Sequence, residues 1–111
     1  MAAPMSLAEF ELLVMLAALR LGPEDAYTVS IADDISRRTG RSVRRANVYT
    51  TLQRLEAKRL ISTHLGDARP ERGGKPRRLV KLEPKGMAAL RSTTRAISAM
   101  VADLSGTLGQ A

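Results

Sequence analysis

Residues 28–60 read TVSIADDISRRTGRSVRRANVYTTLQRLEAKRL, two amphipathic segments on either side of a short turn that contains a glycine. The first segment predicts a helix over about 28–39, with an inward side formed by Val29, Ala32, Ile35 and Ser36. Asp33 and Asp34 are expected on its outer side. Gly40 suits a left-handed C-cap for this helix, and Ser42 can cap the helix that follows.

The second segment predicts a helix over about 43–58. Its inward stripe follows the spacing of a helix and comprises Val48, Leu52, Leu55 and Arg59, with Tyr49 beside it. Its outward side is polar and basic, with Ala46, Asn47, Thr50, Gln53 and Arg54. Two helices joined in this way predict a helix-turn-helix, whose second helix enters the major groove of DNA.

The flanking segments predict a helix before this motif and a hairpin after it. Ser6 and Glu9 form a capping-box pattern that starts a helix over 6–21, which is apolar on more than one side. Residues 60–65 and 77–82 read as short strands around a basic, glycine-tipped loop, which predicts a wing. The predicted fold class is therefore mostly α with a two-stranded β-wing (α+β), a winged helix-turn-helix.

A long helix is predicted from Pro84 to about Thr107, because apolar residues recur there in alternating steps of three and four. Thr94 fills the one gap in this seam, which ends with Leu108. Such a stripe must pack on the chain's own first helix, on a second subunit, or on both. We expect a homodimer whose interface includes Phe10, Leu13, Met87, Leu90, Ile97, Val101 and Leu104.

The domain organisation that follows is a winged helix-turn-helix over residues 1–83 and a C-terminal dimerisation helix over 84–108, together one compact domain. The sequence contains no cysteine, no long apolar run and no signal-peptide pattern at its start, which predicts a cytoplasmic protein without disulfides.

The net charge of +7 is concentrated in the middle of the chain. Residues 37–81 hold fourteen of the 18 Lys and Arg residues and only three acidic residues, whereas the remainder is net negative. A positive middle between mildly acidic ends is typical of a surface that binds a polyanion.

The sequence offers little for catalysis, and we expect no enzyme, no metal and no cofactor. His64 is the only histidine and lies on a predicted strand, so it cannot form a usual zinc site in a chain without cysteine. Gly73-Gly74-Lys75 lacks the first glycine and the Ser or Thr of a phosphate-binding loop.

Two basic clusters are candidates for binding double-stranded DNA. The first surrounds the turn and the start of the second helix of the motif, with Arg37, Arg38, Arg41, Arg44 and Arg45, and it continues along that helix through Asn47, Thr50, Gln53 and Arg54. Asn, Gln and Arg side chains can read base edges through paired hydrogen bonds. The second cluster is on the wing, with Arg69, Arg72, Lys75, Arg77 and Arg78, where arginines suit phosphates or a minor groove.

Several motifs resemble those of the PadR family of transcriptional regulators. They are Tyr27-Thr28-Val29, Asn47-Val48-Tyr49-Thr50-Thr51-Leu52-Gln53-Arg54-Leu55-Glu56, Leu60-Ile61, Glu71-Arg72-Gly73-Gly74 and Leu82-Glu83-Pro84-Lys85-Gly86. They run in the family's order over roughly residues 7–90, and the length resembles the subgroup with a single C-terminal helix. The chain departs from the family at Leu79 and Val80, where an aromatic residue is frequent, and at Glu83, where Thr is usual.

The resemblance implies a homodimer joined through the first and last helices, which binds an inverted-repeat operator, usually as a repressor. It also implies that Tyr49 approaches the DNA backbone. Some relatives bind flat small molecules between interface aromatics, notably Trp, but this chain has no Trp and only Phe10 as phenylalanine. The sequence therefore shows no pocket for a small-molecule effector, which stays unknown.

Two other functions fit a basic winged helix: binding of RNA or the ribosome, and a protein-interaction adaptor that has lost DNA binding. RNA binding is more often accompanied by aromatic residues that stack on bases, and aromatics are only 3% of this chain. An adaptor would need an apolar outer face on the second helix of the motif, where Arg44, Arg45, Asn47 and Gln53 stand instead.

Overall fold

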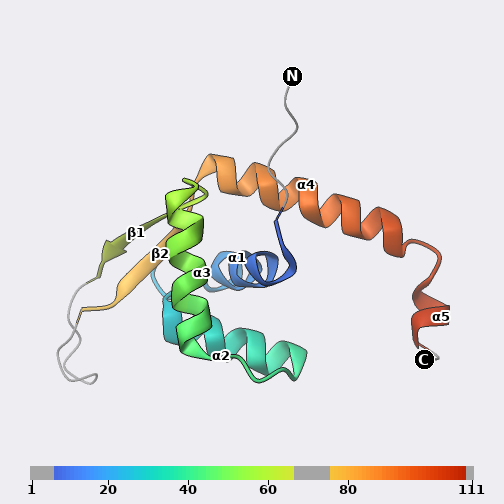
Figure 1. The fold of residues 1–111 in the computed structure, drawn as a ribbon, viewed down its shortest axis with the longest axis horizontal. Helices are drawn as coiled ribbons and strands as arrows, with labels where there is room; N and C mark the ends of the chain where they lie inside the picture. Colours follow the sequence, from blue (N-terminus) through green and yellow to red (C-terminus); the bar gives the residue numbers. More distant parts are fainter. Residues whose placement is uncertain (1–6, 67–75, 110–111) are drawn as a thin grey trace.

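The structure, a computed structural model, describes residues 7–66 and 76–109 (Figure 1). Its elements are α1 (Glu9–Leu21), α2 (Thr28–Thr39), α3 (Arg45–Ala57), β1 (Ile61–Leu65), β2 (Arg78–Leu82), α4 (Pro84–Val101) and α5 (Ser105–Gly109). The two strands pair antiparallel, with Ile61 opposite Leu82 and Leu65 opposite Arg78. This mostly helical chain with one hairpin confirms the predicted fold class. None of the described helices is long and apolar enough to cross a membrane.

Helix α1 lies at the centre of the molecule and packs against α2, α3, β2 and α4 (Figure 1). Its sequence is apolar nearly all round because it meets neighbours on several sides. The largest fully buried side chains are Val14, Met15, Ile31, Val48, Leu55, Leu60 and Val80. They come from α1, α2, α3 and β2 and from Leu60 just before β1, so a single core holds the helix-turn-helix and the wing together.

The start of α1 differs from the prediction. The helix begins at Glu9 rather than at Ser6, which lies outside the described residues. The carboxylate of Glu11, not that of Glu9, accepts the free N–H of the N-cap residue Ala8 at 3.0 Å. Glu9 is instead exposed and accepts a hydrogen bond from Arg41 at 2.9 Å. The local cap is therefore formed by Ala8 and Glu11, and Glu9 pairs with a residue distant in sequence.

The turn between α2 and α3 is held by hydroxyl groups from the last turn of α2. Gly40 has φ 73° and ψ 5°, as predicted for a left-handed C-cap. The Ser36 hydroxyl accepts the N–H of Val43 at 3.2 Å, and the Thr39 hydroxyl accepts the N–H of Arg41 at 3.1 Å. The prediction that Ser42 caps α3 is wrong, since Arg44 is the N-cap and no side chain bonds there.

The end of α3 also departs from the prediction. The helix ends at Ala57, and Arg59 is exposed with φ 62°, so it does not continue the buried stripe. Leu60 fills that place in the core instead, and its N–H donates to the carbonyl of Leu55 at 3.0 Å. A tight left-handed step thus turns the chain from helix into strand.

Helix α4 begins at Pro84 and packs closely on the main chain at the start of β1. The N–H of Glu83 donates to the carbonyl of Leu60 at 3.0 Å. A Cβ atom on Gly86 would overlap that same carbonyl oxygen and would also touch the side chain of Met15. Only a glycine allows this approach, which accounts for Gly86 in the predicted motif.

The last helix is shorter than predicted. Helix α4 ends at Val101, Ala102 is extended, and Asp103 has φ 68° before the short helix α5. Aspartate is one of the few residues other than glycine that tolerate this conformation, and a negative side chain at a helix C-terminus opposes the helix dipole. Leu104 and Leu108 therefore lie beyond α4 rather than along it. The heptad pattern of the sequence does not indicate this break.

Within residues 7–66 and 76–109, two carboxylates are buried in the core, and both are paired with basic residues. Asp34 was predicted on the outer side of α2, but its side chain is only 6% exposed. It accepts a hydrogen bond from Arg20 of α1 at 2.7 Å and another from Arg38 at 3.1 Å. Glu11 accepts one from Lys58, just after α3, at 2.8 Å. These pairs link α1 to α2 and to α3.

We expect Gly86→Ala to destabilise the protein by about 2 kcal/mol or more, because an added methyl group overlaps main chain that has no room to move. Helix propensity alone predicts the opposite sign, since alanine is favoured over glycine in a helix by about 1 kcal/mol. Urea unfolding measures the difference. Gly106→Ala is the control, since a Cβ there meets nothing within 4 Å, and equal stability of the two variants would contradict the close packing of α4.

A second expectation concerns Glu11. Its burial would by itself raise its pKa, but hydrogen bonds from Lys58 and from the Ala8 N–H, with the charges of Lys58 and Arg54, lower the pKa below the usual 4.5. A lowered pKa in the folded state stabilises the protein above the unfolded-state pKa, and this contribution is lost as the pH falls through the folded-state value.

Glu11→Gln should therefore lower the free energy of unfolding at neutral pH by about 1–2 kcal/mol, a modest figure because Lys58 is 34% exposed. The difference from the wild type should shrink below pH 4.5 and vanish below the folded-state pKa. Urea unfolding from neutral pH to about pH 2.5 tests this. Glu9→Gln, at an exposed pair, should change little at any pH, and a pH-independent loss in Glu11→Gln would refute the electrostatic account.

Candidate nucleic-acid interface

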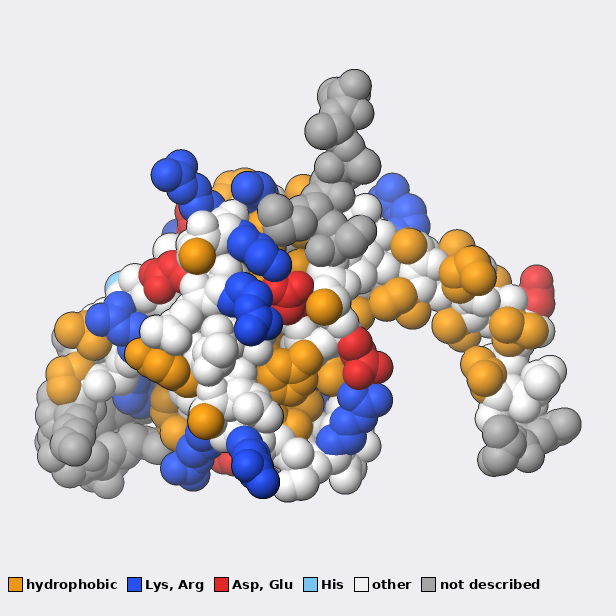
Figure 2. Space-filling view, in the orientation of Figure 1, with side chains coloured by type: hydrophobic (Ala, Val, Ile, Leu, Met, Phe, Trp, Pro, Cys, Tyr) orange, Lys and Arg blue, Asp and Glu red, His pale blue; other side chains and the backbone are white. Residues whose placement is uncertain are grey.

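Helix α3 turns one side into the core and leaves the other open to solvent. Val48, Thr51, Leu52 and Leu55 are buried and fix the helix against α1 and α2. Of these, Thr51 was not predicted. The exposed residues are Arg44, Arg45, Ala46, Asn47, Tyr49, Thr50, Gln53, Arg54, Glu56 and Ala57. Figure 2 shows Lys and Arg side chains grouped on and around this helix.

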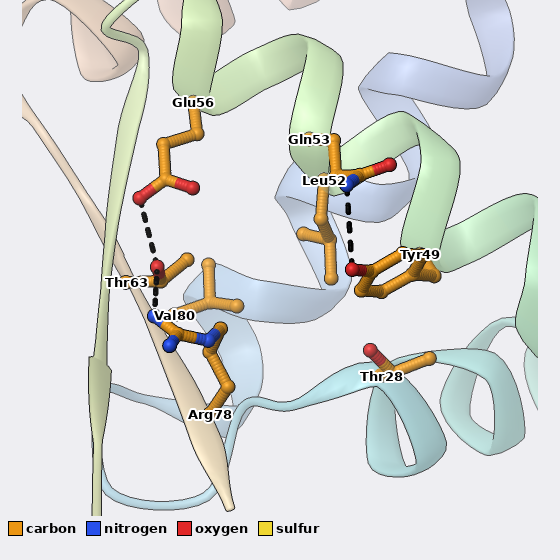
Figure 3. Close-up of a pocket in the computed structure, with 8 residues that line it drawn as sticks. All are labelled: Thr28, Tyr49, Leu52, Gln53, Glu56, Thr63, Arg78 and Val80. Atoms are coloured by element: carbon orange, nitrogen blue, oxygen red, sulfur yellow. Dashed lines mark hydrogen bonds between the residues drawn. The ribbon is translucent and has the colours of Figure 1, made fainter.

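The exposed side chains of α3 border two different hollows. Toward the wing, Tyr49, Gln53 and Glu56 line a cavity of about 300 Å³ together with Thr28, Leu52, Thr63, Arg78 and Val80 (Figure 3). Toward α1, Asn47, Thr50 and Arg54 line a shallower hollow of about 250 Å³ with Phe10 and Thr51. The polar residues predicted as one outward face therefore divide between two flanks of the helix.

Within the larger cavity, a hydrogen bond orders two of the predicted side chains. The amide nitrogen of Gln53 donates to the phenol oxygen of Tyr49 at 3.3 Å, one helical turn away (Figure 3). Tyr49 is 53% exposed and lines this cavity. Its ring therefore faces the space between α3 and the wing rather than the core.

The arginines at the end of α2, in the turn and at the start of α3 differ in how far they are already paired. Arg37 and Arg38 lie 3.9 Å and 3.1 Å from the carboxylate of Asp34, and Arg41 lies 2.9 Å from that of Glu9. Hydrogen bonding and charge from Arg41 lower the pKa of Glu9. Arg44 and Arg45 have no ion pair with any residue in 7–66 or 76–109.

The two wing arginines that the structure describes have different environments. Arg77 is half-buried, with its guanidinium 4.8 Å from the centre of the Tyr27 ring, a cation–π arrangement. Arg78 is exposed, and one of its N–H groups donates to the Thr63 hydroxyl at 3.0 Å. Arg69, Arg72 and Lys75 lie outside the described residues, as does the loop with Gly73 and Gly74.

Several contacts at this surface were not predicted from the sequence, among them the stacking of Tyr27 on Arg77, the bond from Thr63 to Glu56, and the pairing of Arg38 with Asp34. The i, i+4 spacing of Asp34 and Arg38 is a signal that could have indicated the last one. The first two join residues from different elements, which sequence spacing does not relate.

Within the described part of the chain, no three His, Cys, Asp or Glu residues gather where a metal ion could be held. His64 is exposed on β1, where it pairs with Leu79, and it has no second titratable base beside it in this register. The chemistry that the exposed residues do supply is hydrogen-bond donation and positive charge, which suit a polyanion.

Comparison with known proteins identifies the family. Residues 15–92 match the model of the transcriptional regulator PadR-like family, a span from α1 to the first half of α4. A search of curated proteins finds no match.

Solved structures share the fold over most of the chain. A PadR-like transcriptional regulator from Bacillus cereus has a TM-score of 0.68 and 18% identity, covering 92% of each chain. A PadR family transcriptional regulator from Eggerthella lenta has a TM-score of 0.62 and 25% identity, covering 90% of this chain and 85% of its own. A PadR-like transcription factor from Bacteroides fragilis has a TM-score of 0.66 and 24% identity, covering 83% and 82%.

The family match includes the helix-turn-helix, the wing and the glycine contact at the start of α4. It confirms the predicted resemblance, and a family of transcription regulators confirms that the chain is not an enzyme. The chain belongs to the PadR-like family of transcriptional regulators.

Proposed function

We propose that this DNA-binding transcriptional regulator is a homodimeric repressor that recognises an inverted-repeat operator through α3 and the wing. The observation that carries the proposal is the exposed polar side of α3, which begins with two arginines that have no ion pair among the described residues. Because a repressor must reach the DNA that it controls, the proposal includes a cytoplasmic location.

The proposed DNA-binding residues take different tasks. Arg45, Asn47, Thr50, Gln53 and Arg54 extend from α3, where the major groove admits a helix and exposes base edges. Arg44 and Tyr49 suit the phosphates beside the groove. Arg37 and Arg38 keep exposed donors beside Asp34 and suit phosphates as well. The wing contributes Arg78 and Arg77, and the proposal extends to Arg72 and Lys75, for which the structure gives no position.

The dimer is proposed from the apolar surface that one chain leaves uncovered. Helix α4 projects beyond the body of the domain (Figure 1), and hydrophobic side chains follow its far half (Figure 2). The exposed apolar residues, from 41% to 77% exposed, are Ile97, Met100 and Val101 on α4 and Leu104 and Leu108 beyond its end. A contiguous apolar patch of this kind marks a protein interface, and a second copy of this chain is the simplest partner.

On α1, Phe10 and Leu13 are half-buried and suit the same interface, as does Met87 at the near end of α4. Leu90 was predicted there too, but it is only 3% exposed and packs inside its own chain, so the proposed interface excludes it. A two-fold dimer presents two copies of α3, which fits half-sites roughly 34 Å apart on one face of the DNA.

The first prediction concerns base reading by α3. Arg45→Ala and Gln53→Ala should each weaken binding to the DNA upstream of the chain's own gene, by about 1–3 kcal/mol for a lost paired contact with a base. Binding to a scrambled duplex of equal length should fall less. Fluorescence anisotropy at two salt concentrations separates charge from recognition. Arg91→Ala, an exposed arginine on α4, is the control of equal charge, and equal losses on both duplexes would assign these residues to phosphates.

The second prediction concerns the dimer. Replacing Ile97 and Val101 together with Asp should dissociate it, because four like charges would meet at a buried seam. Sedimentation velocity measures the change in mass. Ser92→Asp with Ala99→Asp is the matched control, since these two residues share another side of α4, and it should stay dimeric. A double Ile97/Val101 variant that remains dimeric would contradict the proposed interface.

A further inference from the structure

Glu56 is an acidic residue on the proposed DNA-binding surface, where a negative charge should weaken DNA binding. It is exposed on the last turn of α3 and lines the cavity of about 300 Å³ between this helix and the wing. Only three acidic residues occur in the whole basic segment 37–81. A carboxylate beside a phosphate backbone repels it, so either Glu56 reduces affinity or it has a second task.

The contacts of Glu56 indicate such a task. The hydroxyl of Thr63, on β1, donates to Oε2 of Glu56 at 2.8 Å (Figure 3). Because a hydroxyl has one proton, the Thr63 oxygen is then left as an acceptor, and Nη1 of Arg78, on β2, donates to it at 3.0 Å. The carboxylate polarises the hydroxyl and so strengthens the bond from Arg78. Three elements are joined by this chain of two hydrogen bonds.

The hairpin needs a contact of this kind if Arg78 is to hold one position. Arg78 lies at the outer end of β2, opposite Leu65 in the register, and it is exposed. A free arginine samples many rotamers, and a two-stranded hairpin is stable only through what it packs against. Holding the side chain before binding removes part of the ordering cost when DNA arrives.

We propose that Glu56 and Thr63 are positioning residues that hold Arg78 at the edge of the cavity between α3 and the wing, where it binds a backbone phosphate of the operator. A guanidinium carries five N–H donors, of which Thr63 takes one, so Arg78 keeps donors for a phosphate. The hydroxyls of Thr28 and Tyr49 line the same cavity. The inference rests on the proposed DNA binding and adds a role for an acidic residue in it.

Removal of Glu56 distinguishes positioning from simple repulsion, because the two predict opposite signs. If Glu56 only repels phosphate, Glu56→Ala and Glu56→Gln both tighten binding. If Glu56 positions Arg78, Glu56→Ala weakens binding to the upstream DNA by about three- to tenfold, and Glu56→Gln, which keeps an acceptor for Thr63, weakens it less.

The experiment is a salt titration of DNA affinity for the wild type, the two Glu56 variants, Thr63→Val, Thr63→Ser and Arg78→Ala. Glu56→Ala, Thr63→Val and Arg78→Ala should each lower the slope of log affinity against log salt by about one, the value for one lost phosphate contact. Thr63→Ser keeps the hydroxyl and should bind like the wild type. Glu56→Ala combined with Arg78→Ala should bind no more weakly than Arg78→Ala alone, since both remove the same contact.

Tighter or unchanged binding by Glu56→Ala, or full additivity with Arg78→Ala, would overturn the positioning role. Thermal unfolding checks that each variant is folded. If Glu56→Ala is unfolded, Thr63→Val, which keeps the shape of the side chain, tests the proposal in its place. A wild-type protein that binds upstream and scrambled DNA equally would instead contradict the proposed operator recognition, whatever the variants do.

Discussion

The burial of α1 between four other elements is the constraint on which the rest of the structure depends. Val14 and Met15 of α1 are completely buried, and α1 contacts α2, α3, β2 and α4. Met15 also lies beside Gly86, where α4 meets the carbonyl of Leu60. Helix α3, the proposed DNA-reading helix, and α4, the proposed dimerisation helix, thus both pack on α1.

The charged residues of the chain stabilise the packing around α1 as well as forming the exposed basic surface. Arg20 and Lys58 each bond a buried carboxylate, and Arg38 and Arg41 are each partly occupied by an acidic partner. The fourteen Lys and Arg residues of segment 37–81 therefore overstate how many cations are unpaired at the proposed interface, because the acidic partners of Arg38, Arg41 and Lys58 lie outside that segment. Arg44 and Arg45 have no ion pair with the described residues. They lie at the start of α3, and the first residues of a recognition helix are those that contact base edges in the major groove.

Local patterns in the sequence predicted the order and type of the elements from α1 to α4, but not the separate helix α5. They predicted α2 and its left-handed cap to the residue, because Gly40 and helical periodicity act within one turn of the chain. The errors at Asp34 and Glu9 arise from partners in other elements, Arg20 and Arg41. The sequence likewise placed Arg78 and Glu56 in the right elements but not within one hydrogen-bonded chain, since Thr63 joins them only after the hairpin has formed.

Because α3 and α4 both pack on α1, the packing of the core would affect how a dimer reads DNA. If two chains pair through the exposed half of α4, the distance and angle between their two α3 helices are set by how α4 sits on α1, because α1 also carries α3. Half-site spacing then depends on contacts such as that of Gly86 with Leu60, far from any base. The side chains of α3 would select the bases of each half-site, whereas the packing of the core would select the spacing between them.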